Sequence, residues 1–239
     1  MNRLTVQTAA IHDDSATGLD VAILFAKHRI RTTLVCEDAP TAERLESIAK
    51  RAMAGDVDAS GLLSCVTDNA ASLSQTDLAL SARNRGDFAL SLPMLSPTDI
   101  PIQFHPPLSA CPLIELDPEG LSNASREGLE RWFSDLGKAV CFGNSTPEFS
   151  GQALLDAYQW AADILLTYHS TPWEIDEAME DGGWGQGACL RQDQEGLEKA
   201  YHRRRSRQGD PRVCQVAAVD RAVKEGRLGR QIGWGWYRY

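Results

Sequence analysis

The sequence predicts an α/β domain at residues 1–145, followed by an all-helical domain at residues 146–239. Two observations favour this fold class. In the first part, short runs rich in β-branched residues alternate with helical patterns, as in domains whose parallel strands are joined by helices. In the second part, apolar residues recur at helical spacing, and glycines and prolines separate the segments. The 239 residues are 43% hydrophobic, which is enough for a core in each domain.

The predicted elements of the first domain follow one another closely. Leu4 to Ala10 alternates weakly as a first strand, a helical pattern runs through Val21 and Ala26, and Arg31 to Cys36 is a β-branched strand. Strand, helix and strand in direct succession form a βαβ unit with parallel strands. The other predicted elements are helices at 41–52 and 121–136 and strands at 62–66, 77–82 and 138–142. Together they predict a doubly wound sheet, with helices on both faces.

Charge and cysteine content narrow the class of protein. The formal net charge of −9 argues against a nucleic-acid partner. The six cysteines form no C-x-x-C pair and have no histidine at zinc spacing, so we expect buried, reduced thiols and no metal site. The chain starts without a signal-peptide pattern and has no apolar run of about 18 residues. We therefore expect a cytoplasmic location and no membrane partner.

The second domain begins with strong helical signals. Thr171-Pro172-Trp173-Glu174 is a capping box with proline at the first helical position, which predicts the start of a helix. Gly182 and Gly183 predict its end, because glycine supplies left-handed geometry. A longer helix is predicted before it, from Gly151 to Tyr168. Its expected apolar face consists of Leu154, Leu155, Tyr158, Ala161, Ala162 and Leu165.

This part of the chain resembles a known family. Glu174 to Met179 (EIDEAM), then Gly183 and Gly187, then Asp193-x-x-Gly196-Leu197, resemble the C-terminal domain of the 3-hydroxyacyl-CoA dehydrogenases. The closing segment 225–239 resembles the family's E-G-R-x-G-x-K-T-G-x-G-F/W-Y-x-Y ending, and these glycines and aromatics are expected to be structural. The resemblance implies a shortened Rossmann-like domain followed by the family's helical domain. It also implies a homodimer formed by the helical domain, an acyl-CoA-type substrate and the cofactor NAD.

The resemblance extends to a candidate acid–base pair. Segments 103–107 (QFHPP) and 111–115 (CPLIE) resemble the family's H-F-F-N-P and M-x-L-V-E motifs. The resemblance implies that His105 exchanges the proton of the substrate hydroxyl group at an interdomain cleft and that Glu115 orients the imidazole. Histidine suits this role because it titrates near neutral pH. Gln152 falls on the family's substrate-contacting asparagine, and its amide is one methylene further from the backbone.

The turn after the first strand bears on the cofactor. The family's G-x-G-x-x-G motif ends here on Gly18, while Asp13 and Ser15 replace its first two glycines. A carboxylate then stands at the helix N-terminus, where the pyrophosphate would bind. The family's ribose-binding aspartate falls on Cys36, beside Glu37. The resemblance thus implies an NAD site that includes Gly18 and Glu37, and the replaced glycines oppose NAD binding.

Two alternatives for function follow from these residues. One is a 3-hydroxyacyl-CoA dehydrogenase-like enzyme of fatty-acid metabolism. The other is a non-catalytic, dimeric binding or scaffold relative that has lost its cofactor site. Pro93 and Met94 replace the family's serines, and residues 83–88 are too few for the helix expected there. The basic cluster at 202–207 is either a solvated helix end or a landing site for CoA phosphates or an acidic partner.

Overall fold

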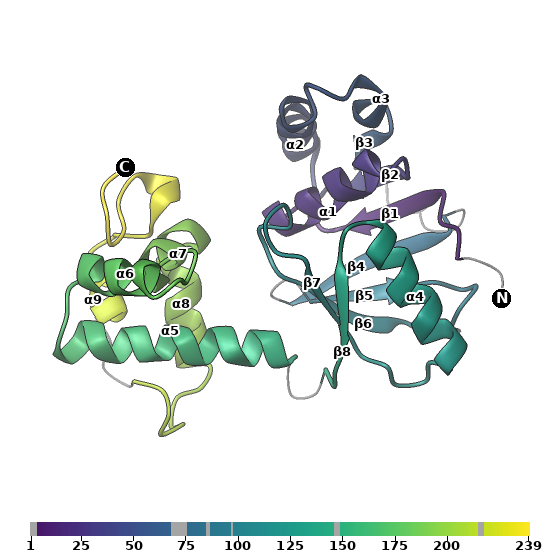
Figure 1. Cartoon of the computed structure of the whole chain (residues 1–239). Coiled ribbons are helices and arrows are strands. Elements are labelled where there is room, and N and C mark those ends of the chain that lie inside the picture. Colours follow the sequence, from purple (N-terminus) through teal and green to yellow (C-terminus); the bar gives the residue numbers. More distant parts are fainter. Residues whose placement is uncertain (1–3, 68–75, 85–86, 97, 146–148, 215–217) are drawn as a thin grey trace. The chain divides into compact units, whose positions relative to one another are not determined.

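A computed structural model describes residues 4–67, 76–84, 87–96, 98–145, 149–214 and 218–239 (Figure 1). The chain divides into two compact units, Met1–Ser150 and Gly151–Tyr239. The first unit contains a mixed sheet with helices and the second is helical, so the predicted fold class is confirmed. The division lies slightly after the predicted boundary at residue 145.

The first unit is built on one 8-stranded sheet with the strand order β3-β2-β1-β4-β5-β6-β7-β8. Strands β1 to β4 are parallel, β5, β6 and β7 pair antiparallel in turn, and β8 is parallel to β7. The elements in chain order are β1 Thr8–His12, α1 Ala16–Lys27, β2 Arg31–Val35, α2 Ala39–Ala52, α3 Val57–Ser60, β3 Leu63–Val66, β4 Leu78–Asn84, β5 Asp87–Ser91, β6 Ile100–Phe104, β7 Leu113–Leu116, α4 Asn123–Asp135 and β8 Ala139–Phe142.

A β-hairpin stands where the family resemblance placed a crossover helix. Strands β4 and β5 pair antiparallel, with Asn84 opposite Asp87. Only two residues separate these strands, and a parallel pair needs a crossover of about a dozen residues or more. The shortened connection therefore reverses the direction of β5. Strand β6 reverses again and so runs parallel to β4.

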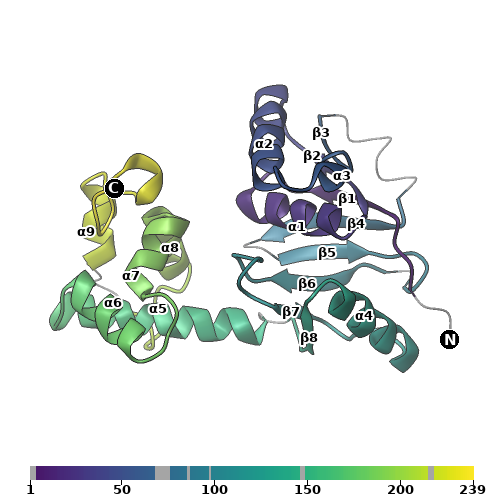
Figure 2. The same cartoon turned by 45° about the horizontal axis from the view of Figure 1, so that its top comes forward.

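The core of the first unit lies on one face of this sheet. Its strand residues share that face by register, as Ile11, Leu80 and Leu90 do across β1, β4 and β5. Helices α1 and α4 lie on that face (Figure 2). The ring of Phe25 on α1 meets that of Trp132 on α4 edge to face, at 5.7 Å between centroids. Helices α2 and α3 contribute to the same core. Within the described residues the doubly wound prediction is wrong, because the connection that would carry a helix to the second face is a hairpin.

The second unit contains α5 Ser150–Tyr168, α6 Pro172–Asp181, α7 Ala188–Glu195, α8 Leu197–Arg205, α9 Ala218–Lys224 and the 3-10 turn η1 Arg230–Ile232. The start of α6 follows the predicted capping pattern. The Glu174 carboxylate accepts hydrogen bonds from the Thr171 backbone N–H at 2.8 Å and from its hydroxyl at 2.7 Å. Gly183 takes the left-handed conformation, with φ at 87°, just after the helix. The predicted ends of α6 are confirmed.

Helix α5 buries a polar stripe in place of part of its predicted apolar face. Leu154 is 72% exposed and Leu165 is 41% exposed, whereas Ala162 is buried and Tyr158 packs against the cluster that contains it, so the predicted face turns inward only in part. The buried residues of this helix are Asp156, Gln159, Trp160, Ala162 and Asp163. A helix with polar side chains inside needs partners for them, because an unpaired buried carboxylate is costly.

Two arginines of α8 are those partners. Arg203 Nη1 donates to Asp156 Oδ1 at 3.4 Å, and Arg204 Nη1 lies 4.0 Å from Asp163 Oδ2. Both arginines are buried. At Arg203 and Arg204 the basic cluster is therefore neither a solvated helix end nor accessible to a CoA phosphate. Burial raises the pKa of Asp163 to about 6, against the lowering effect of its hydrogen bond and of the two arginines.

Two buried aspartates of the family motif tie the helices to the C-terminal tail. Asp176 accepts the N–H groups of Cys189 and Leu190, each at 2.8 Å, at the start of α7. It also accepts the hydroxyl of Tyr237 at 2.7 Å. Asp193 accepts the backbone N–H of Tyr237 at 2.9 Å. These motif residues therefore have a structural role in this unit.

Other expectations concern cysteines and membranes. All six cysteines are free, and Cys36, Cys189 and Cys214 are buried while Cys141 is exposed. Within the described ranges, no helix is long and apolar enough to cross a membrane. The same residues contain no group of three or more His, Cys, Asp or Glu side chains that could hold a metal ion.

Candidate active site

The two residues of the predicted acid–base pair are in contact in the first unit. His105 Nε2 lies 2.8 Å from Glu115 Oε2, and the two residues are 6% and 2% exposed. Glu115 stands on β7 opposite Gln103 of β6, and His105 follows β6 directly. The register of the two antiparallel strands therefore brings together residues that are separated by a loop. A carboxylate on one ring nitrogen fixes the imidazole tautomer and leaves the other nitrogen for a substrate.

The direction of the strands places this pair at a defined edge of the sheet. Strand β6 runs parallel to β4 and β1, because two antiparallel pairings separate it from β4. The C-terminal ends of β1 and β6 therefore lie at the same edge. His105 and the β1–α1 turn share that edge, which is where ligands bind in open α/β sheets.

Lys138, which the sequence analysis did not single out, holds the loop between the two members of the pair. Its Nζ donates to the carbonyl oxygen of Leu108 and, at 2.9 Å, to that of Cys111. The residue is 7% exposed, and burial lowers the pKa of its ammonium group. A buried ammonium with two carbonyl acceptors keeps residues 108–111 in one conformation. No sequence motif marks a lysine at the start of a short strand, so this role could not be predicted from the sequence.

The β1–α1 turn satisfies its own hydrogen-bonding groups. Ser15 caps α1, and its Oγ accepts the N–H groups of Thr17 at 3.2 Å and Gly18 at 3.3 Å. The same hydroxyl donates to Asp13 Oδ2 at 2.6 Å, and the Ser15 N–H donates to Asp13 Oδ1 at 3.1 Å. Asp14 Oδ2 accepts the N–H of Glu37 at 3.0 Å, just after β2.

These residues do not fit the pyrophosphate of NAD. The N–H groups of the first turn of α1 that would bind phosphate oxygens are bonded to Ser15, whose hydroxyl is in turn bonded to the Asp13 carboxylate. Gly18 keeps one part of the family's geometry: a Cβ there would overlap the carbonyl oxygen of Asp13, so the helix approaches the turn closely. The backbone N–H of Glu37 is bonded to Asp14. Cys36, at the predicted ribose position, is 4% exposed.

Gln152 belongs to the second unit, on α5. Its Nε2 donates to Asp156 Oδ1 at 2.8 Å, so its amide joins the polar stripe of that helix. Its substrate-contacting role stays a prediction. The Thr146-Pro147 pair that preceded it in the family motif lies outside the described residues.

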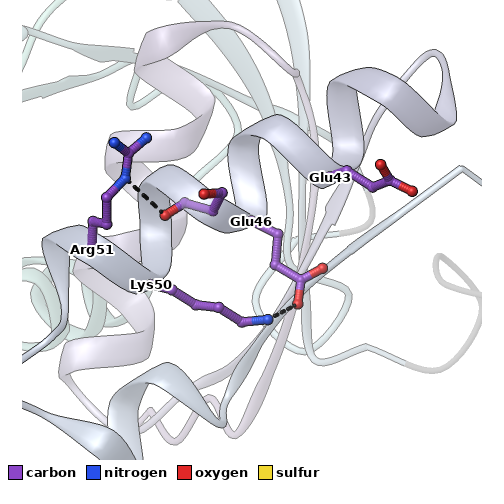
Figure 3. A pocket seen from close by; sticks show the side chains of 5 residues that line it. Glu43, Glu46, Lys50 and Arg51 are labelled. Carbon is purple, nitrogen blue, oxygen red and sulfur yellow. Dashed lines mark hydrogen bonds and ion pairs between the residues drawn. The ribbon is translucent and has the colours of Figure 1, made fainter.

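A hollow on α2 offers no alternative site. It is lined by Glu43, Glu46, Ser47, Lys50 and Arg51, all from this one helix (Figure 3). Lys50 Nζ lies 2.7 Å from Glu46 Oε1, and Arg51 Nε donates to the Ser47 carbonyl oxygen at 3.4 Å. These are charged side chains paired along a solvated helix face.

Known proteins share parts of this chain. Residues 150–239 match the family model described as the C-terminal domain of 3-hydroxyacyl-CoA dehydrogenase. A peroxisomal bifunctional enzyme of Danio rerio is 31% identical over 120 residues, which are 44% of this chain but only 16% of that enzyme. The chain thus spans a small part of the length of this curated relative. The cytoplasmic location expected from the sequence stays a prediction.

Solved structures share the fold over nearly the whole chain. The crystal structure of FadB2 from M. tuberculosis has a TM-score of 0.80 at 19% identity and covers 99% of this chain and 100% of that one. The (S)-3-hydroxybutyryl-CoA dehydrogenase PaaH1 from Ralstonia eutropha has a TM-score of 0.75 at 18% identity, with 98% and 99% covered. The chain therefore has the two-domain fold of these structures, with a Rossmann-like domain before a helical one. Residues 150–239 thus match the C-terminal domain of the 3-hydroxyacyl-CoA dehydrogenase family, and the chain as a whole shares the fold of these solved structures.

Proposed function

We propose that this protein binds a 3-hydroxyacyl- or 3-ketoacyl-CoA thioester and that His105 and Glu115 exchange a proton with the 3-oxygen of the acyl group. The supporting observation is the 2.8 Å contact between two enclosed side chains of complementary chemistry. Where a nicotinamide cofactor binds and takes the hydride from carbon 3, the imidazole would take the hydroxyl proton and return it in the reverse direction; without that acceptor the pair only hydrogen-bonds the 3-oxygen. Glu115 orients the ring and stabilises its protonated form. Such positioned proton transfer contributes about 10²- to 10⁴-fold to rate.

We propose further that the β1–α1 turn no longer binds NAD in the manner of the family, in which NAD accepts the hydride. Asp13 and Asp14 bring two negative charges to the place of the pyrophosphate. A unit charge about 4 Å away at an effective dielectric near 20 opposes binding by on the order of a few kcal/mol. Each ~1.4 kcal/mol costs tenfold in affinity. This self-capped turn favours the second candidate function, a dimeric acyl-CoA-binding relative that performs no hydride transfer.

The test restores the two glycines of the β1–α1 turn and then removes the imidazole of His105. The variants are the wild type, Asp13→Gly with Ser15→Gly, and the same pair with His105→Asn. Asp58→Gly with Ser60→Gly is a matched control, because it makes the same two changes at the same spacing on α3. NADH binding is measured by fluorescence titration, and reduction of acetoacetyl-CoA by NADH absorbance.

We expect negligible NADH binding by the wild type and by the control, and a gain of tenfold or more on restoring the turn. Added His105→Asn should lower the restored reduction rate by at least a hundredfold without changing NADH affinity. Tight NADH binding by the wild type would contradict the lost-site proposal. A restored rate that does not depend on His105 would contradict the acid–base pair.

A further inference from the structure

The β4–β5 hairpin places a carboxylate beside the acid–base pair. Asp87, the first residue of β5, stands opposite Gln103 of β6, and Gln103 stands opposite Glu115 of β7. Residues opposite each other in a ladder share one face of the sheet, with Cβ atoms about 5 Å apart. Asp87, Gln103 and Glu115 therefore form a polar row across three adjacent strands. The reversed direction of β5 is what brings Asp87 into this row.

The row lies on the face of the sheet away from the hydrophobic core. Phe88, Ile102 and Leu116 are the next residues along their strands, point to the other face and are fully buried in the core. Gln103 and Glu115 are nevertheless 4% and 2% exposed, whereas Asp87 at the end of the row is half-buried. Convergent polar groups next to a candidate acid–base pair are the kind of groups that fix the orientation of a ligand.

Asp87 has an unused hydrogen-bonding atom. Its Oδ1 is enclosed and has no hydrogen-bond partner among the residues that the structure describes. Burial raises the pKa of this carboxyl, and the Arg83 cation and a hydrogen bond from the Phe88 backbone N–H oppose the shift in part. The net shift raises the share of the neutral carboxyl, which donates a hydrogen bond, whereas the ionised form only accepts one. A buried polar atom without a partner is unfavourable, so a partner from outside the chain would stabilise it.

The distance to the acid–base pair suits a small acyl group. His105 is two residues beyond Gln103, and its ring contacts Glu115, on the same face as the row. Asp87 and His105 are thus diagonal neighbours across β5 and β6. Residues in such diagonal positions of an antiparallel pair lie about 7–8 Å apart. At this spacing the two side chains are close enough to contact two oxygens of one small acyl group, such as those at the head of a 3-oxygenated thioester.

We propose that Asp87 is a further substrate-binding residue, whose carboxyl donates a hydrogen bond to the thioester carbonyl oxygen while His105 contacts the 3-oxygen. This inference rests on the proposed function. It gives the chain a donor for the second substrate oxygen near a segment where Pro93 and Met94 replace the serines expected by resemblance. The substrate class that follows is an acyl thioester with an oxygen at carbon 3, in preference to a saturated thioester or free CoA.

The test compares two ligands by calorimetric titration of the full chain. Acetoacetyl-CoA carries both oxygens, and CoA carries neither. Asp87→Leu removes the donor at similar volume, and Asp87→Ala removes it at smaller volume should the leucine variant not fold. Asp87→Asn keeps a donor in the amide group. Asp58→Leu, on the exposed helix α3, is the matched control.

We expect Asp87→Leu and Asp87→Ala to weaken acetoacetyl-CoA binding at least tenfold and to leave CoA binding unchanged. Asp87→Asn and Asp58→Leu should stay within about threefold of the wild type. Equal weakening of both ligands would show a merely structural role and overturn the inference. If Asp87→Leu binds acetoacetyl-CoA as the wild type does while His105→Asn does not bind it, the substrate-binding role of Asp87 is refuted and that of His105 stands. No acetoacetyl-CoA binding by the wild type would overturn the proposed function and this inference with it.

Discussion

Replacing Gly235 by alanine should loosen the C-terminal tail from the helical unit. A Cβ at this position would overlap Asp193 Oδ1, and the backbone of Gly229 closes the other side. Asp193 is fully buried and accepts the N–H groups of Trp236 at 2.7 Å and Tyr237 at 2.9 Å. The carboxylate must move, and those bonds must lengthen or break.

The expected loss of stability follows from these bonds. Asp193 also accepts the hydroxyl of Tyr239 at 3.0 Å. Hydrogen bonds to a charged group contribute about 1.5–3 kcal/mol each, and their losses are not additive. Partial loss of the set predicts a destabilisation of about 3 kcal/mol for Gly235→Ala. Tyr239→Phe removes one bond and should cost about 1–2 kcal/mol.

Urea unfolding followed by tryptophan fluorescence measures both variants, since Trp236 lies in the tail itself. The control is Gly185→Ala, because a Cβ at Gly185 meets no atom within 4 Å. It should stay within about 0.5 kcal/mol of the wild type. A Gly235→Ala protein as stable as this control would refute the reasoning, because the aspartate would then have room that the structure denies it.

Three further predictions concern other parts of the molecule. Burial raises the pKa of Asp163 from 3.8 to about 6, so its contribution to folding is full below pH 3.8 and is lost as pH rises through 6. As pH rises from 4 to 7, the free energy of unfolding of Asp163→Asn should therefore increase by about 3 kcal/mol relative to that of the wild type, at ~1.4 kcal/mol per pKa unit. A difference between the two proteins that does not change with pH would contradict this. Lys138→Met removes the donor to the Leu108 and Cys111 carbonyls and should lower the free energy of urea unfolding by about 1–3 kcal/mol. The control Lys50→Met, at an exposed position of α2, should lower it by less than about 0.5 kcal/mol. Equal losses in the two variants would contradict the role of Lys138 in holding residues 108–111. The exposed side chains of Leu154, Ile164, Leu165 and Tyr168 on α5 favour the expected homodimer; light scattering should find a dimer that Leu165→Glu dissociates and Val57→Glu does not, and a monomeric wild type would exclude it.

Much of the local structure and the family could be predicted from the sequence. The capping box at Thr171 and Glu174 and the left-handed Gly183 depend on neighbours in the chain, and local residues suffice to form them. The contact between His105 and Glu115 was predicted through the family resemblance and is confirmed, although two strands must pair to form it. The missing helix after residue 83 was visible as a short connection.

The tertiary structure decided which faces turn inward. Helix α5 carries both an apolar and a polar stripe, and helical periodicity alone does not say which one is buried. Arg203 and Arg204, far along the chain, select the stripe with Asp156 and Asp163 by pairing with it. Asp87 and Lys138 likewise gain their surroundings only from strand register and loop packing. Such partners are set by contacts between distant segments, and no spacing within one segment encodes them.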